Sequence, residues 1–172
     1  MGKSLLIIGA GGHAKVTAEA AGAMKDKSGQ SVYHQIDFLD DNLENAAGKI
    51  TDLERLGKEY DEVFCGIGDN ALRKRLLEQT EDFGFCIPSI VHPTAYISPS
   101  ASVGRGTVIE PRAVVNANTV VGDGCIISTG AVLDHDVTVG PYAHVNVAAV
   151  CKARSRVGAG VKIDAGVIVE ES

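Results

Sequence analysis

From Val91 onward, an aliphatic residue returns at every sixth position, with one cysteine among them and no insertion. The positions are Val91, Ile97, Val103, Ile109, Val115, Val121, Ile127, Leu133, Val139, Val145, Cys151, Val157, Ile163 and Val169. An α-helix cannot keep this period on one face, because six residues rotate the stripe by about 240°. Short strands can, since every second side chain of a strand lies on the same face. The pattern predicts a parallel solenoid of short strands and tight corners.

An ordinary β-sandwich is the alternative fold for a chain of short strands. Its turn signals would recur at irregular spacing. Here the ladder runs without interruption, and a small or β-branched residue such as Ala113 or Thr119 lies four residues after most of its positions. The repeat therefore favours the solenoid.

Residues 1–86 follow a different pattern, in which short apolar runs alternate with helix-prone stretches. Residues 4–8 predict a buried strand, and a glycine-rich turn and a helix through Met24 follow. Further strands are expected in the run that ends at 38–41 and at 63–68, after which Asp69 is placed to cap a helix. This order predicts a Rossmann-like α/β domain over 1–86, followed by the solenoid over 87–172.

Composition and charge argue against some classes of binding partner. It has 172 residues, is 45% hydrophobic and carries a formal net charge of −6, which argues against nucleic acid and anionic membranes as partners. No apolar run approaches the roughly 18 residues of a membrane span, and the N-terminus shows no signal-type core. We therefore expect a cytoplasmic protein. Cys65, Cys86, Cys125 and Cys151 form no CxxC pair, so we interpret them as small buried residues rather than disulfide or zinc ligands.

The glycine-rich turn after the first expected strand is a candidate anion site. Gly11, Gly12 and His13 stand where backbone amides at a helix N-terminus can approach a phosphate, and Asp40 and Asp41 follow the second strand, where an acid can accept from a ribose or base. A nicotinamide enzyme and a turn without ligand are the alternatives. Three strands make only half of a full dinucleotide fold, which favours a mononucleotide or a nucleotide-linked sugar.

Several stretches together resemble one branch of the hexapeptide-repeat acyltransferases, the NeuD/PglD-like sugar acetyltransferases. They are GAGGHA, the LDD after the second strand, GIGDNALRKRL and the hexad ladder, so the resemblance covers nearly the whole chain. It implies a left-handed parallel β-helix with three hexads per coil and a homotrimer. It further implies that the N-terminal domain holds a nucleotide-linked sugar, and that acetyl-CoA lies in the groove between adjacent β-helices.

The same resemblance assigns the site residues. In the stretch VLDHDV, His135 would be the catalytic base and Asp136 its acidic neighbour, and in PYAHV, His144 would be a second active-site histidine. The nucleotide would face the glycine turn and the aspartate pair. The residue types suit the chemistry, because a histidine can accept the proton that an amine or hydroxyl loses on acylation, and a carboxylate can orient its ring. By strand parity, both histidines should point away from the ladder.

Four of the later basic residues are candidates for binding the phosphates of CoA. They are Lys152, Arg154, Arg156 and Lys162. A solvated charged face is the alternative interpretation. The family usually continues for further coils and a terminal segment, so we also expect a β-helix shortened at Ser172, an alternative cap or weak CoA binding.

We therefore expect an acetyl-CoA-dependent N-acetyltransferase acting on a UDP-type amino sugar. An O-acetyltransferase of the sialic acid type and a non-catalytic nucleotide-sugar-binding protein are the alternatives. Zinc catalysis needs three ligands, and His92 lies too far from His135 and His144 in the sequence to complete such a set. We expect no metal.

Overall fold

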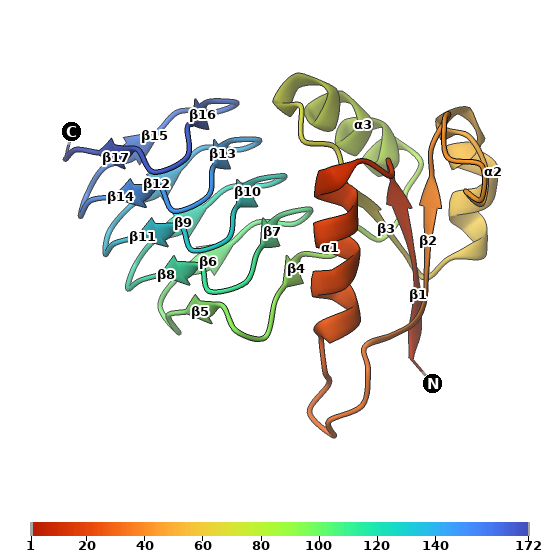
Figure 1. The fold of residues 1–172 in the computed structure, drawn as a ribbon, viewed down its shortest axis with the longest axis horizontal. Coiled ribbons are helices and arrows are strands. Elements are labelled where there is room, and N and C mark those ends of the chain that lie inside the picture. Colours follow the sequence, from red (N-terminus) through yellow and green to blue (C-terminus); the bar gives the residue numbers. More distant parts are fainter. Residues whose placement is uncertain (1, 172) are drawn as a thin grey trace. The chain divides into compact units, whose positions relative to one another are not determined.

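The N-terminal part of the chain folds as a three-stranded parallel sheet with helices, as the computed structural model shows for residues 2–171 (Figure 1). The strands are β1 (Lys3–Ile8), β2 (Tyr33–Leu39) and β3 (Glu62–Cys65), in the order β2-β1-β3. The helices are α1 (Gly12–Ala23), α2 (Leu53–Leu56) and α3 (Asn70–Asp82), with 3-10 turns η1 (Ile50–Asp52) and η2 (Gly57–Glu59) beside α2. The central strand β1 is fully buried from Leu5 to Ile8. This confirms the predicted Rossmann-like α/β unit.

Local chemistry explains how these elements begin and meet. Asp69 caps α3, because its Oδ1 accepts a hydrogen bond from the Leu72 amide at 2.7 Å. Gly66 follows β3 at a point of close approach. A Cβ there would lie 2.8 Å from the Cβ of Ala14 in α1, too close for two carbon atoms. Glycine at position 66 therefore lets α1 pack against the end of β3.

The second part is a parallel β-helix in which each strand has two residues. Its strands are β4 (Ile90–Val91), β5 (Tyr96–Ile97), β6 (Ser102–Val103), β7 (Val108–Ile109), β8 (Val114–Val115), β9 (Val120–Val121), β10 (Ile126–Ile127), β11 (Val132–Leu133), β12 (Thr138–Val139), β13 (His144–Val145), β14 (Val150–Cys151), β15 (Arg156–Val157), β16 (Lys162–Ile163) and β17 (Ile168–Val169). Every residue of the predicted ladder is the second residue of its strand. Because each strand pairs with the strand three along the chain, one coil takes eighteen residues, as in the register of Leu133 with Cys151.

Three parallel sheets form the sides of the β-helix, in the orders β16-β13-β10-β7-β4, β17-β14-β11-β8-β5 and β15-β12-β9-β6. We call them sheets C, D and E. The ladder residues and the small residues of the corners, including Ala113, Ala131 and Ala149, form one buried core. The left-handed β-helix predicted from the hexads and the resemblance is thus confirmed.

The chain divides into two units, of which the first ends at Pro88 and the second begins at Ser89. In the segment just before this division, the sequence interpretation of one cysteine was wrong. Cys86 is exposed, whereas Cys65, Cys125 and Cys151 are buried. The reason is its position, since Cys86 lies in the segment that follows α3 and belongs to no helix or strand. No helix within residues 2–171 has the length and apolarity needed to cross a membrane.

Candidate active site

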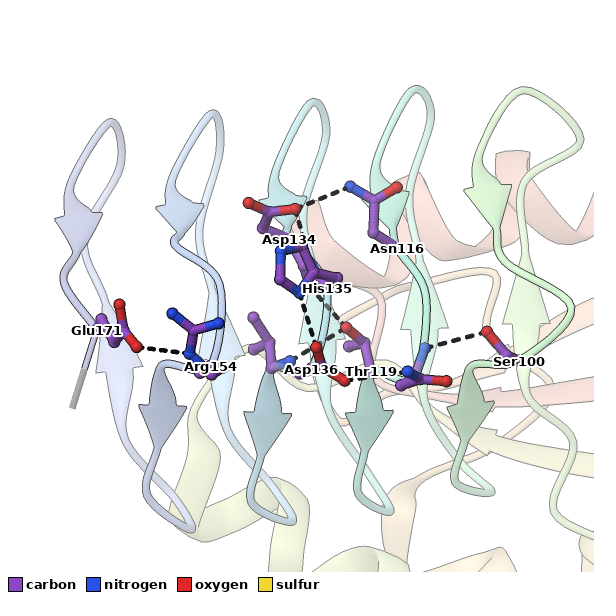
Figure 2. Close-up of polar contacts among 10 residues, drawn as sticks. Ser100, Asn116, Thr119, Asp134, His135, Asp136, Arg154 and Glu171 are labelled. Atoms are coloured by element: carbon purple, nitrogen blue, oxygen red, sulfur yellow. Dashed lines mark hydrogen bonds and ion pairs between the residues drawn. The ribbon is translucent and has the colours of Figure 1, made fainter.

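The turn after β11 carries His135 between two aspartates, at the corner between sheets D and E (Figure 2). The ring nitrogen Nδ1 of His135 lies 2.7 Å from Oδ2 of Asp136. The backbone amide of His135 donates to Oδ1 of Asp134, also at 2.7 Å. Both the ring and the backbone of His135 are therefore held by neighbouring carboxylates.

Electrostatics decide which ring nitrogen of His135 carries the proton. The hydrogen bond from His135 lowers the pKa of Asp136, and hydrogen bonding from Asn118 lowers this pKa further. An ionised carboxylate only accepts hydrogen bonds, so Nδ1 must be the donor. With Nδ1 as the donor, the neutral form of the ring carries its lone pair on Nε2. The side chain of His135 is 47% exposed. A base of this kind can take a proton from a bound acceptor.

The preceding coil supports this turn through three side-chain contacts. Nδ2 of Asn118 donates to Oδ1 of Asp136 at 3.0 Å, and Nδ2 of Asn116 approaches Oδ1 of Asp134 at 3.5 Å. The buried Thr119 donates from Oγ1 to the Asp134 carbonyl at 2.7 Å. Figure 2 shows these contacts reaching from one coil to the next.

His144, the second predicted histidine, lies on a different face. It is the first residue of β13 in sheet C, whereas His135 follows β11 in sheet D. Its Nε2 lies 3.0 Å from Oγ of Ser128, which fixes one edge of the ring. The side chain is half-buried. The structure thus joins His135 to Asp136 and places His144 on a separate sheet.

The four basic residues predicted to bind CoA are distributed over several faces. Lys152 pairs with Glu170 at 2.6 Å, and Arg154 pairs with Glu171 at 2.5 Å. Both cations already have carboxylate partners. The remaining two are exposed on different sheets, Arg156 on β15 in sheet E and Lys162 on β16 in sheet C. Lys162 is in register with His144 one coil below.

The glycine turn of the first unit joins β1 to α1. The Ala10 amide donates to Oδ2 of Asp40 at 2.9 Å, and the other oxygen of Asp40 accepts from the amides of Asn42 and Leu43 at 2.8 and 3.0 Å. These backbone hydrogen bonds, with the Asn42 amide foremost, lower the pKa of Asp40. A hollow of about 330 Å³ lies here, lined by Ala10, Gly11, Asp40, Asn42 and Leu43.

The structure therefore brings two of the five predicted nucleotide residues, Gly11 and Asp40, into one hollow. Gly12 begins α1 and His13 follows it, but neither lines the hollow among the described residues. Asp41 also lies outside its lining, and its Oδ1 accepts from the Ile50 amide at 3.1 Å. Gly11 is the N-cap of α1 and supplies no side-chain cap, and a helix N-terminus favours an anion.

Several site residues escaped the sequence analysis. Asn116 and Asn118 stand eighteen residues before Asp134 and Asp136, so the coil length of three hexads could have identified them. Ser128 and Leu43 gave no comparable signal. Within residues 2–171, no group of three or more His, Cys, Asp or Glu side chains is placed to hold a metal ion.

Two family models match the chain, one on each unit. The PglD N-terminal domain matches residues 4–80, and the GMPPB C-terminal domain matches residues 91–172. A curated relative is UDP-N-acetylbacillosamine N-acetyltransferase from Bacillus subtilis (strain 168), which is 33% identical over 120 residues. That match covers 62% of this chain and half the length of the relative.

Solved structures match over nearly the whole chain. The acetyltransferase domain of PglB from Neisseria gonorrhoeae FA1090 is 32% identical with a TM-score of 0.75, covering 98% of this chain and 92% of that one. The same domain has been solved in complex with acetyl coenzyme A, with a TM-score of 0.72. PerB from Caulobacter crescentus, in complex with CoA and GDP-perosamine, is 30% identical with a TM-score of 0.70, covering 97% and 91% of the two chains.

Proposed function

The chain belongs to the PglD-like family of sugar acetyltransferases with hexapeptide repeats, and from this premise we propose that it N-acetylates a nucleotide-linked amino sugar with acetyl-CoA as donor. The observation that carries the proposal is the 2.7 Å contact between His135 Nδ1 and Asp136 Oδ2 on an exposed turn. The relatives support the substrate class. One is named for a UDP-linked sugar, and another was solved with GDP-perosamine.

His135 is the general base of the proposed reaction. Acetyl-CoA supplies an acetyl group activated as a thioester. As the amine nitrogen of the acceptor bonds to the acetyl carbon, Nε2 of His135 takes the proton that this nitrogen loses. The carbon–sulfur bond breaks, and the same nitrogen of His135 returns the proton to the departing thiolate. Asp136 stabilises the imidazolium in between and keeps the ring in the tautomer that the step requires.

The first unit is the proposed site for the nucleotide. The start of α1, at Gly11, Gly12 and His13, suits a phosphate, because the N-terminus of a helix favours negative charge. Asp40 holds the Ala10 amide and thereby fixes the shape of the turn. Asp41 completes the proposed set beside Asp40. A UDP-type nucleotide is our preferred ligand for this unit.

A homotrimer is part of the proposal, because one face of the β-helix is apolar, exposed at its two ends and half-buried between them. The outward residues of sheet D are Tyr96, Val114, Val132, Val150 and Ile168. Tyr96 is 54% exposed and Ile168 is 56% exposed. A continuous apolar row of this kind is typical of a contact between protein chains. A second copy on sheet D would also border the corner that carries His135, where we place acetyl-CoA with Arg156 of the adjoining sheet E near its phosphates.

Thiol release from acetyl-CoA tests the function directly. Purified protein is supplied with UDP- and GDP-linked amino sugars, and with the matching sugars that carry a hydroxyl at the amine position. We expect thiol release that depends on an amino sugar, with an amide in the product by mass spectrometry. Release with hydroxyl acceptors alone would indicate O-acetylation instead. Tight binding of nucleotide-sugars without any thiol release would identify a non-catalytic binding protein.

A further inference from the structure

Asn118 and Asp136 occupy the same place in successive coils. They are eighteen residues apart, and both have left-handed backbone geometry, with φ of 58° and 59°. The Asp136 amide donates to the Ala117 carbonyl at 2.9 Å, which ties the two turns together. This stacking places the side chain of Asn118 within hydrogen-bond distance of the carboxylate that holds His135.

The two oxygens of Asp136 have separate partners. Oδ2 contacts Nδ1 of His135 at 2.7 Å, and Oδ1 accepts from Nδ2 of Asn118 at 3.0 Å. A carboxylate held by donors at both oxygens cannot rotate about its terminal bond without losing one of them. Asn118 is itself anchored, because its backbone amide donates to Oγ of Ser100 at 3.1 Å. The support of His135 thus extends over three coils.

We propose that Asn118 is a positioning residue of the acetyl transfer reaction, which acts by fixing the Asp136 carboxylate against His135. This proposal rests on the proposed function, since it assigns the residue a part in that reaction. Asn118 touches neither the ring of His135 nor the reacting atoms in this assignment. Its contribution is to favour the tautomer of His135 with the proton on Nδ1 and the lone pair on Nε2.

Other charged groups surround the same turn. Arg154, in the next coil, lowers the pKa of Asp136 through its positive charge, but less than the hydrogen bond from Asn118 does. Arg154 is paired with Glu171, and Asp134 binds the backbone amide of His135. Among residues 2–171, Arg154 directs its hydrogen bond to Glu171 and not to Asp136, and the carboxylates of Glu171 and Asp134 cannot donate one. Asn118 therefore supplies the directional contact that these charges do not.

Two substitutions of Asn118 separate positioning from folding. Asn118→Asp keeps the shape of the side chain and tolerates left-handed geometry, but it replaces the donor with an acceptor. Asn118→Gly removes the side chain without straining the turn. Arg112→Gly is the matched control, because Arg112 is an exposed residue of the same coil with a φ of 61°.

The first measurement is the tautomer of His135, from the nitrogen chemical shifts of its ring in the labelled protein. In the wild-type protein we expect the Nδ1-protonated form. Both Asn118 variants should shift the ring toward the Nε2-protonated form, whereas Arg112→Gly should not. The second measurement is steady-state kinetics. Losing one hydrogen bond to a charged group should lower kcat about tenfold in the Asn118 variants, with KM unchanged for both substrates.

An unchanged tautomer in both Asn118 variants overturns the proposal, as does a kcat equal to that of the wild-type protein. An equal loss of kcat in Arg112→Gly also overturns it, because turn geometry alone would then explain the effect. The tautomer measurement needs no substrate. A wild-type protein without acetyl transfer would therefore contradict the proposed function, while the nitrogen shifts would still decide whether Asn118 fixes the ring.

Discussion

Thr119 offers a test of how the β-helix holds the turn that carries His135. Its hydroxyl is fully buried and donates to the Asp134 carbonyl at 2.7 Å. The same oxygen accepts from the Val137 amide at 3.3 Å. In several other turns, the corresponding amide donates to the carbonyl three residues back, as Ala131 does to Ser128. The hydroxyl of Thr119 thus replaces a backbone contact in this turn.

The substitution Thr119→Val keeps the shape of the side chain and removes its hydroxyl. One carbonyl and one amide then lose a buried partner, and each unsatisfied group costs about 1–3 kcal/mol. We expect the free energy of unfolding to fall by about 2 kcal/mol and Tm to fall by about 4–8 °C for a chain of this length. Because the Asp134 carbonyl immediately precedes His135, kcat should fall as well.

Thr107 is the matched control for this prediction. Its hydroxyl donates to the Gly122 carbonyl at 2.9 Å and accepts from the Cys125 amide at 3.0 Å. Thr107→Val should therefore cost the same stability but leave kcat unchanged. Calorimetry at equal protein concentration and the thiol-release assay provide the two readouts. A wild-type Tm in Thr119→Val, or equal losses of kcat in both variants, would refute the reasoning.

Three further predictions concern the other parts of the site and the core. Asp40→Asn should raise KM for the nucleotide-sugar and leave kcat unchanged, because the Ala10 amide loses its carboxylate; an unchanged KM would remove Asp40 from the binding site. Arg156→Ala should raise KM for acetyl-CoA more than Lys152→Ala does, because the ammonium group of Lys152 already pairs with a glutamate; equal KM values would contradict this assignment. Burial raises the pKa of the Cys151 thiol to about 11, so the folded state favours the neutral thiol. The stability that this preference contributes is lost as pH rises from the ordinary thiol pKa to about 11. In urea unfolding, the free energy of unfolding should fall by about 1.4 kcal/mol per pH unit in this range. The Cys151→Val variant should not show this fall, and the same slope in both proteins would exclude Cys151 as the cause.

The β-helix could be predicted because the residues that repeat at every sixth position are also the residues that pack in its core. Each ladder residue, Leu133 for example, is aliphatic because it faces the interior of a coil. The same period contains more than the sequence analysis used. Three hexads make a coil, so Asn118 had to lie beside Asp136, and this contact could have been deduced without coordinates.

Other features depend on contacts that no repeat in the sequence indicates. The 3-10 and helical turns from Ile50 to Glu59 lie outside any regular pattern of apolar residues. The direction of the Asp40 side chain toward the Ala10 amide follows from how the loop after β2 folds back on the glycine turn. The pairing of Arg154 with Glu171 joins two exposed side chains, and exposed charges have many possible partners. Only the folded chain selects among them.

Acetyl transfer by a His135→Ala variant is the most direct test of the account. The rate of amide formation from acetyl-CoA and a nucleotide-linked amino sugar is compared with that of the wild-type protein, and nucleotide-sugar binding is measured in parallel. Loss of the general base should lower kcat by roughly 10²- to 10⁴-fold, with nucleotide-sugar affinity retained. Wild-type turnover in His135→Ala would contradict the assignment of His135 as the base.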